Sequence, residues 1–548
     1  MKLLELIRKE SSVSLGWLFF IAAVSAICNA LLLIIVNAAL EDTALGKPTF
    51  RWLFLFVVLL AIFALTRKHL LIEVSKEFEQ ILHKVRTRIA DKIRRADLLS
   101  LEKLERAGIY ASVQRETLEI SSIGKPLVTV VQALLLLVLT LIYIFYMSPF
   151  AFLFAASIIV AASIFYLTKK RALGSALRDV LRREDKVFET LSHVLDGIKE
   201  VQLNTARSED LMNHARSRSQ AARDQRISVD SEFIALSIVS QIAIYGGLAL
   251  LVFVLPQHFA GLREGLMQIT IAYIFLINPV FGTLGMIPDL YHAEVAVQSI
   301  HDIESRLDQA VRPVPLKFAE LSSFQEIVLD HVAFQFEDPK SDHPFAVGPI
   351  NLTINPGEVL FLAGGNGSGK STLLRLITAL YHPQSGAIYL DGTRIETPSQ
   401  VGSYQSLFTT VFSDFHLFDR LYGLPGLDPE LVDRLLRELG LTGKTDILDG
   451  AFATLNLSTG QRKRLALLVA LLEDRPIFIL DEWAAEQDAE FRKKFYREIL
   501  PQLKAAGKAV IAVTHDDRYF SVADKVFRME EGRLTPLPVE GTDDPFEM

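Results

Sequence analysis

The chain has 548 residues, half of them hydrophobic, with one cysteine and a formal net charge of −7. This length allows two or more domains, and a mean hydropathy of +0.30 is high for a soluble protein. The single cysteine, Cys28, excludes an intramolecular disulfide and a cysteine-ligated metal cluster, and the acidic charge disfavours nucleic acid as a partner.

The first 300 residues contain six apolar stretches, each close to the roughly 20 residues that a helix needs to cross a bilayer. They cover residues 14–39, 52–73, 126–147, 150–168, 233–255 and 265–288. The first stretch is too long for the apolar region of a secretory signal, and we expect Cys28 to pack within it. Only residues 147–150 join the third stretch to the fourth, so we expect a tight hairpin there.

The distribution of basic residues predicts an orientation. The long loops after the second and fourth stretches are rich in lysine and arginine, whereas the opposite connections hold only Lys47, Arg51 and Arg263. By the positive-inside rule, both long loops and both termini are cytoplasmic.

The two long loops, about 50 and 60 residues each, read as helical, with reversal points near residues 100–108 and 193–204. A short transverse helix at each reversal could contact a later domain and couple it to the membrane helices. An ordinary cytoplasmic helical hairpin is the alternative.

Polar side chains within the stretches are either groups that line a cavity or partners in helix–helix hydrogen bonds, and the second reading is favoured. They are Asn29, Asn37, Gln132, Tyr143, Tyr146, Gln241, Tyr245 and Asn278. Pro279, Gly282, Gly285 and Pro288 indicate a bendable sixth helix, which serves either gating or packing.

The second half of the chain begins with short strand-like runs and then alternates helices with apolar strands, which indicates a parallel α/β core. Residues 364–372 follow the apolar run 359–363 and match the P-loop pattern G-x-x-x-x-G-K-[ST]. A flexible Gly/Ser turn, the alternative, would need neither the lysine nor the flanking strand and helix. The residues predicted to bind the nucleotide here are Gly364, Asn366, Gly367, Ser368, Gly369, Lys370, Ser371 and Thr372.

Lys370 is suited to reach the β- and γ-phosphates, and the Ser371 hydroxyl to hold Mg²⁺. The buried run 477–482 ends in Asp481, suited to hold Mg²⁺ through water, and Glu482, placed to polarise the attacking water. The twelve histidines form no cluster with ligand spacing, so Mg²⁺ is the one metal expected. Residues 457–461 open a helix whose first turn is free to bind an anion.

This ordered set of motifs resembles the half-transporters of the ABC exporter family over essentially the whole chain. In that family Phe336 matches the aromatic residue that stacks on adenine, Asp488 the D-loop aspartate and His515 the switch histidine beside the γ-phosphate. The residues that resemble the signature motif L-S-G-G-Q, with Thr459 in place of its first glycine, are Ser458, Thr459, Gly460 and Gln461.

One motif departs from the family pattern. Ser413 stands where the Q-loop glutamine is usual, so we assign Ser413 to the nucleotide site and consider Asp414 as a substitute oxygen ligand for the metal. Together with Thr459 and the segments 412–418 and 480–485, this departure resembles the branch that exports cyclic peptides, siderophore peptides and microcins.

The resemblance implies an α-helical six-span ABC exporter transmembrane domain over residues 1–308 and an α/β P-loop nucleotide-binding domain over 326–538. Between them the pattern breaks around Pro313 and Pro315, which indicates a linker over 309–325, and the acidic, turn-rich tail over 539–548 is expected to be disordered. It implies an ATP hydrolase with ATP and Mg²⁺ as cofactors, Lys370, Glu482 and His515 as catalytic residues, and a homodimer surrounded by lipids of the bacterial inner membrane. The expected substrate is a peptide exported by alternating access. A lipid flippase or multidrug exporter is the alternative, and an ATP-gated channel or regulatory subunit a weaker one.

Overall fold

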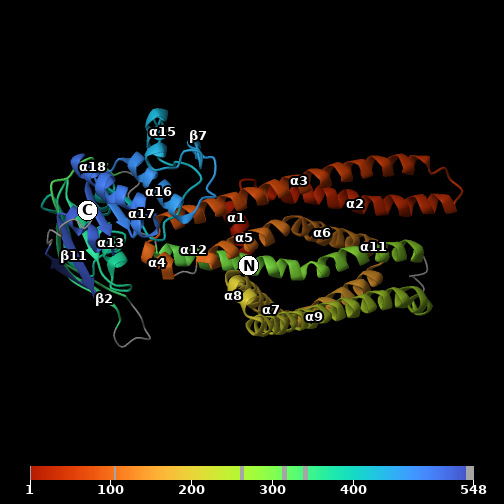
Figure 1. Ribbon diagram of the computed structural model, residues 1–548. Coiled ribbons are helices and arrows are strands. Elements are labelled where there is room, and N and C mark those ends of the chain that lie inside the picture. Colours follow the sequence, from red (N-terminus) through yellow and green to blue (C-terminus); the bar gives the residue numbers. More distant parts are fainter. Residues whose placement is uncertain (1, 104–105, 260–264, 311–317, 337–343, 539–548) are drawn as a thin grey trace. The chain divides into compact units, whose positions relative to one another are not determined.

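The computed structural model describes residues 2–103, 106–259, 265–310, 318–336 and 344–538, with the side chains of 106–112, 166–167 and 169–173 outside this description (Figure 1). It divides into two compact units. The first takes residues 1–92 and 105–307, and the second takes residues 93–104 and 308–548. Pro313 and Pro315 of the predicted linker and the predicted tail lie outside the described residues.

The first unit is helical. Its elements are α1 (Lys2–Glu10), α2 (Leu15–Ala44), α3 (Phe50–Arg95), α5 (Arg106–Ser122), α6 (Gly124–Met147), α7 (Pro149–Asp196), α8 (Ile198–Leu203), α9 (Thr205–Ala249), η1 (Leu250–Val254), α10 (Leu255–His258), α11 (Leu266–Gly285) and α12 (Ile287–Ala310). Among the described residues, five helical stretches are long and apolar enough to cross a membrane, and the shorter apolar helix Pro149–Phe165 coincides with the fourth predicted stretch.

Helix ends in the first unit follow local sequence signals. The tight hairpin between α6 and α7 is present, because the Ser148 side chain accepts a hydrogen bond from the N–H of Ala151 and Pro149 begins α7. The sixth stretch is interrupted at Met286, directly after Gly285. Cys28 is buried, as expected.

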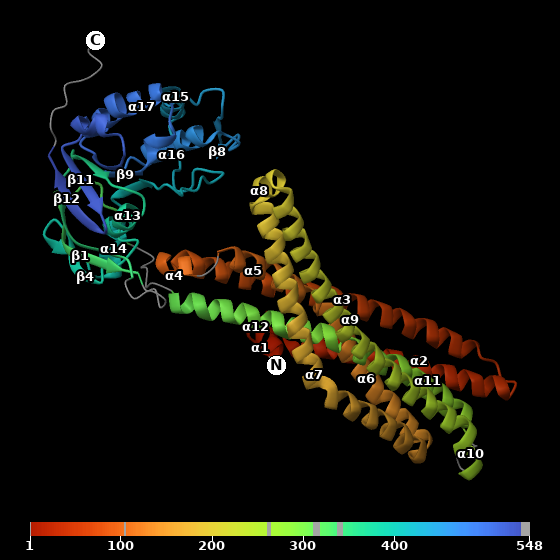
Figure 2. The ribbon, with the colours of Figure 1, turned by 60° about the horizontal axis from the view of Figure 1, so that its bottom comes forward.

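A short helix stands at each predicted reversal point. Helices α7 and α9 run side by side, and α8 connects the C-terminal end of α7 to the N-terminal end of α9 (Figure 2). At the first reversal, α4 (Leu98–Lys103) belongs to the second unit, where Leu98 and Leu99 pack against its core. The predicted contact between a loop helix and the later domain is therefore confirmed for α4.

The second unit combines two main sheets with flanking helices. The strands are β1 (Ile327–Gln335), β2 (Ala346–Ile354), β3 (Val359–Ala363), β4 (Ser385–Leu390), β5 (Thr393–Arg394), β6 (Phe408–Val411), β7 (Ile447–Leu448), β8 (Ala451–Phe452), β9 (Ile477–Asp481), β10 (Ala509–Val513), β11 (Lys525–Glu530) and β12 (Arg533–Leu537). The helices are α13 (Lys370–Ile377), α14 (Pro398–Gln405), α15 (Pro429–Glu438), α16 (Thr459–Glu473), α17 (Ala489–Lys494) and α18 (Leu500–Ala505).

The larger sheet has the order β12-β11-β3-β10-β9-β6 and is parallel except for β12, whereas the smaller sheet, β2-β1-β4-β5, is antiparallel. All residues of β3, β9 and β10 are buried, because helices cover both faces of a parallel sheet. The carboxyl ends of β3, β6, β9 and β10 meet at one edge, which is where ligands bind in open α/β sheets.

Candidate functional site

The loop between β3 and α13 has a backbone that requires glycine at several positions. Gly364, Gly367 and Gly369 have φ values of +149°, +75° and +105°. A Cβ atom on Gly364 would lie 2.3 Å from the main-chain oxygen of Met529, and one on Gly369 would lie 2.9 Å from the Val347 side chain. These glycines therefore fix a tight loop at the start of α13, as the P-loop pattern predicts.

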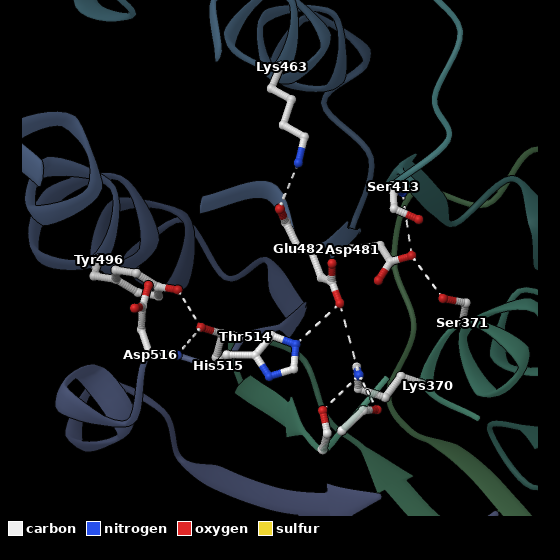
Figure 3. A network of polar contacts seen from close by, with 12 residues as sticks. Lys370, Ser371, Ser413, Lys463, Asp481, Glu482, Tyr496, Thr514, His515 and Asp516 are labelled. Atoms are coloured by element: carbon white, nitrogen blue, oxygen red, sulfur yellow. Dashed lines mark hydrogen bonds and ion pairs between the residues drawn. The ribbon is translucent and has the colours of Figure 1, made fainter. Parts of the chain in front are cut away.

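Buried polar groups of this loop are arranged to meet an anion. The Lys370 ammonium is 5% exposed and donates at 2.8 and 2.9 Å to the carbonyl oxygens of Gly364 and Gly365 (Figure 3). The Ser368 hydroxyl is buried and has no hydrogen-bond partner among the described residues. A buried cation and an unsatisfied hydroxyl beside a helix N-terminus fit a phosphate chain.

A hydroxyl and a carboxylate lie together at the end of β9. The Ser371 hydroxyl donates at 3.2 Å to Asp481, which is 2% exposed, and the Ser413 main-chain N–H lies 3.4 Å from the same carboxylate oxygen. Since Mg²⁺ keeps several waters and binds one or two protein oxygens plus phosphate, Ser371 and Asp481 fit this ion. Asp414 is exposed, and no hydrogen bond or ion pair among the described residues joins it to either of them.

The next residue, Glu482, faces both the P-loop lysine and His515, the second residue after β10. Its carboxylate lies 3.3 Å from Nε2 of His515 and 3.9 Å from the Lys370 ammonium (Figure 3). Glu482 has a φ of +49°, a left-handed conformation that is unusual for a residue with a side chain. The carboxylate is about one-third exposed, so a water molecule can reach it.

Lys463 of α16 supports this conformation and was not identified from the sequence. Its ammonium is buried and donates at 2.8 Å to the main-chain oxygen of Glu482. The Trp483 indole in turn donates at 2.7 Å to the main-chain oxygen of Lys463. Lys463 lies between Arg462 and Arg464 in the sequence, so it reads as part of a solvated basic run, and only the packing of α16 reveals its burial.

The turn that carries His515 is held by the residues on either side. The Thr514 hydroxyl accepts a hydrogen bond from the N–H of Asp516 at 3.0 Å and is bonded to the Tyr496 hydroxyl at 2.6 Å. Burial raises the pKa of Tyr496, which keeps its hydroxyl protonated. These contacts fix the backbone of the turn after β10, and they therefore fix the position of His515.

Aromatic residues complete the cavity beside the P-loop. Phe336 and Phe345 line a cavity of about 390 Å³ together with residues 366–372 and Glu482. Their ring centroids are 6.5 Å apart. The structure thus places Phe336 beside the phosphate-binding loop, where an adenine ring could stack on it.

The ring of Phe336 also packs near Tyr381, which contacts α4. Its centroid lies 6.2 Å from that of Tyr381 in an edge-on arrangement. The Tyr381 hydroxyl donates to the Glu102 carboxylate and accepts a hydrogen bond from Arg375 at 2.8 Å, and Arg375 lies 3.4 Å from Glu102. Burial and the hydrogen bond to Glu102 together raise the pKa of Tyr381 to about 12. These three polar residues were not singled out in the sequence.

The signature residues are not part of the assembly around Lys370. Ser458 and Gln461 form a reciprocal capping box at the start of α16, and Ser458 and Thr459 are exposed. Asp488 caps α17 through the N–H of Phe491, which lowers the pKa of this carboxyl, and it also pairs with Arg464. Within the described part of the chain, no hydrogen bond or ion pair joins Asp488 or residues 458–461 to the P-loop.

Comparison with known proteins identifies this arrangement. Residues 347–485 match the family model described as "ABC transporter". The chain is 31% identical over 537 residues to the ATP-binding protein SyrD of Pseudomonas syringae pv. syringae, covering 94% of this chain and 93% of that protein. The chain belongs to the ABC transporter family. This ABC transporter also has the fold of a bacterial Atm1-family ABC exporter solved with ATP bound, with a TM-score of 0.75, 17% identity, and coverage of 96% of this chain and 94% of that one.

Two further relatives differ in what their names state. An ATP-dependent lipid A-core flippase of Cupriavidus metallidurans is 25% identical over 83% of this chain and 78% of its own length. A probable syringafactin export ATP-binding/permease protein, SyfD of Pseudomonas syringae pv. syringae, is 32% identical over 34% of this chain and 30% of its own length.

These findings fix the general activity. The chain is a multi-pass membrane protein and an ABC exporter half-transporter, whose nucleotide-binding domain binds ATP and couples its hydrolysis to transport. A half-transporter of this fold works as a dimer and moves a substrate.

Proposed function

We propose that this chain exports a peptide-type substrate across the bacterial inner membrane as a homodimer that works by alternating access. The substrate is a cyclic peptide, a siderophore or its precursor, or a microcin. The nucleotide-binding domain and both termini are cytoplasmic, and membrane lipids surround the helices of the first unit.

We infer a homodimer because the residues of the nucleotide site fall into two separate groups within one chain. One group of residues lies together: Lys370, Ser371, Asp481, Glu482 and His515. Among the described residues, no hydrogen bond or ion pair joins the signature turn to this group. A symmetric dimer brings the signature turn of each copy onto the P-loop of the other, so two composite sites form.

Each residue around the P-loop has a separate role in this proposal. Bound MgATP supplies the cleavable phosphoanhydride bond and a cation that neutralises phosphate charge. Lys370 exchanges its two carbonyl acceptors for phosphate oxygens, and Ser371 and Asp481 hold Mg²⁺, Asp481 through water. Glu482 orients the attacking water and accepts its proton, and His515 holds the Glu482 carboxylate in place and contacts the γ-phosphate.

The substrate class rests on resemblance. Thr459 in the signature, Ser413 in the Q-loop and the segment around Trp483 are typical of the peptide-exporting branch, and SyfD is named for syringafactin export. A lipid flippase is the second candidate, because the lipid A-core flippase matches more of this chain than SyfD does.

The catalytic assignment is tested by Glu482→Gln in the full-length protein. We expect steady-state ATP hydrolysis to fall at least about a hundredfold, because the water loses its base, while ATP binding persists and a closed dimer accumulates. Glu498→Gln, a change of an exposed carboxylate on the same unit, serves as the control and hydrolyses ATP at the wild-type rate. An undiminished rate in Glu482→Gln would remove Glu482 from the mechanism.

The substrate class is tested by stimulation of hydrolysis in nanodiscs. Cyclic peptides and lipid A-core are added in parallel to the wild-type protein. Stimulation by peptides, together with loss of secreted peptide in cells that carry Glu482→Gln, is expected. Stimulation by lipid A-core alone would replace the peptide assignment with the flippase.

A further inference from the structure

Polar residues from four helices of the first unit surround one cavity, here called the inner polar pocket. The cavity has a volume of about 190 Å³. Its polar lining comes from α2, α3, α6 and α11, and the residues that matter for the argument are Ser25, Asn29, Phe63, Arg67, Gln132 and Asn278. Among the described residues, no acidic side chain lines it.

The cationic group of this pocket points toward the apolar part of its helix. The Arg67 guanidinium lies 5.7 Å from the ring centroid of Phe63, one turn earlier in α3. Side chains on a helix lean toward its N-terminus, and here that direction leads into the apolar run 52–66. An arginine that reached for the membrane surface would extend the opposite way.

Arg67 has no acidic partner within the membrane stretches of this chain. Among the described residues, no ion pair includes it. The only acidic residue in the six apolar stretches is Glu73, which ends the second stretch and pairs with Lys76 at 2.9 Å. Because a second copy has the same sequence, its membrane stretches offer no other carboxylate. Arg67 is exposed in the single chain and stands at the end of the apolar run 52–66. An arginine beside the hydrocarbon core without an acidic partner is a candidate for ligand binding.

The amide groups of the pocket divide into two kinds. The first kind joins two helices: Gln132 donates a hydrogen bond to Ser25 at 3.1 Å, as Asn37 does to Tyr143 at 3.0 Å outside the pocket. For these two amides, the helix–helix hydrogen bond that was favoured from the sequence is present. For the side chains of Asn29 and Asn278, no hydrogen bond is found among the described residues. These two amides remain available to a ligand beside Arg67.

The pocket lies at one depth in the first unit. Residues 29, 67, 132 and 278 are about 18 to 26 Å from the helix ends at the short connections, at about 1.5 Å per residue. In a hydrocarbon core of about 30 Å, and with the proposed orientation, this is the cytoplasmic half of the membrane. A substrate that enters from the cytoplasm or the inner leaflet would meet the pocket first.

We propose that the inner polar pocket binds one oxyanion of the exported substrate, with Arg67 pairing with a carboxylate and Asn29 and Asn278 completing its hydrogen bonds. This inference rests on the proposed function and adds that the exported peptide is acidic. A cavity of about 190 Å³ accommodates a carboxylate with its short stem, and the rest of the peptide extends beyond it. Arg is the side chain best suited to this partner, since its planar donors bind a carboxylate in pairs. A lipid phosphate has the same oxyanion chemistry and is distinguished by the experiment.

The test compares an acidic cyclic lipopeptide with its methyl ester, using stimulation of ATP hydrolysis by the full-length dimer in nanodiscs of zwitterionic lipid. In Arg67→Gln we expect the half-maximal concentration of the acid to rise about tenfold and that of the ester to stay unchanged, each normalised to the variant's own basal rate. Arg67→Lys keeps the charge and is expected to restore part of the loss. Lys68→Gln, a change of the neighbouring cation that does not line the pocket, is the control.

Each result decides between the explanations. Equal losses for the acid and the ester, or no loss for either, would overturn the oxyanion site. A third result is that lipid A stimulates the wild-type protein, the peptides do not, and Arg67→Gln removes the stimulation. In that case the pocket binds a phosphate oxyanion, and the peptide assignment is wrong. If Arg67→Gln is poorly folded by size exclusion, Arg67→Lys and Asn278→Ala provide the same comparison between acid and ester.

Discussion

Replacing Lys463 with methionine is expected to lower the kcat of ATP hydrolysis about tenfold to thirtyfold. Glu482 has a φ of +49°, and a left-handed conformation costs a residue with a side chain about 1 to 2 kcal/mol. The Lys463 ammonium donates at 2.8 Å to the Glu482 carbonyl, and a hydrogen bond from a charged donor contributes about 1.5 to 3 kcal/mol. This bond therefore offsets the strain at the residue that is proposed to orient the water.

The substitution also removes an ion pair at 3.5 Å with the half-exposed Glu486, and such a pair contributes little. The size of the effect therefore follows mainly from removing the bond to the Glu482 carbonyl. A loss of about 1.4 kcal/mol lowers the equilibrium constant that favours the observed Glu482 conformation about tenfold, and a loss of about 2 kcal/mol lowers it about thirtyfold. Methionine keeps the length and the apolar contacts of the lysine stem. The Trp483 indole bonds to the main-chain oxygen of residue 463 at 2.7 Å, and this bond does not require the ammonium. The fold around α16 is therefore expected to persist.

A second lysine provides a closely matched control. The Lys508 ammonium donates at 2.8 Å to the main-chain oxygen of Asp474, which also has a φ of +49° but lies outside the cavity beside the P-loop. In Lys508→Met we expect a loss of thermal stability but a wild-type kcat. In Lys463→Met we expect the KM for ATP to change less than about threefold while kcat falls. Equal losses of kcat in the two variants, or none in Lys463→Met, would refute the positioning role.

Two further substitutions test the loop and the contact with α4. Gly364→Ala is expected to lower the melting temperature and abolish ATP binding, because its Cβ would lie 2.3 Å from the main-chain oxygen of Met529. Gly365→Ala is the control and is expected to keep the wild-type melting temperature, because a Cβ there would have no neighbouring atom within 4 Å among the described residues. Equal melting temperatures for the two variants would contradict this reading of the loop. Tyr381→Phe keeps the ring beside Phe336 but removes the hydroxyl that bonds to Glu102, so we expect substrate stimulation of hydrolysis to fall severalfold with unchanged affinity for a fluorescent ATP analogue. A loss of that affinity with normal stimulation would show that Tyr381 acts only through Phe336.

Many features of the second unit could be predicted because they depend on neighbouring residues. The glycines of the P-loop reflect backbone angles that side chains disfavour, and Val359–Ala363 and Ile477–Asp481 are apolar because both faces of these strands are covered. Their carboxyl ends then meet at one edge, which places Ser371 beside Asp481. The roles given to these residues remain predictions until the variants are measured.

Other features depend on residues that are far apart in the sequence. Lys463 is 19 positions from the carbonyl that it supports, and Glu102 is 279 positions from Tyr381. No local pattern indicates either pair, because a charged side chain in a helix is equally compatible with solvent and with a buried partner. Asn29 and Gln132 were likewise equivalent in the sequence. Only the packing of the helices gave Gln132 a hydrogen-bond partner, whereas Asn29 has none among the described residues.

The sequence by itself determined that this protein joins a helical membrane unit to a P-loop domain, since apolar length, loop charge and glycine spacing follow from local chemistry. The tertiary structure decided which side chains act on one another. Within one chain the P-loop and the signature turn belong to separate assemblies. Lys463 is buried and donates to the Glu482 carbonyl, and Arg67 lines a pocket that contains amides but no carboxylate among the described residues. Such contacts depend on how helices and strands pack, and periodicity and spacing do not encode that packing.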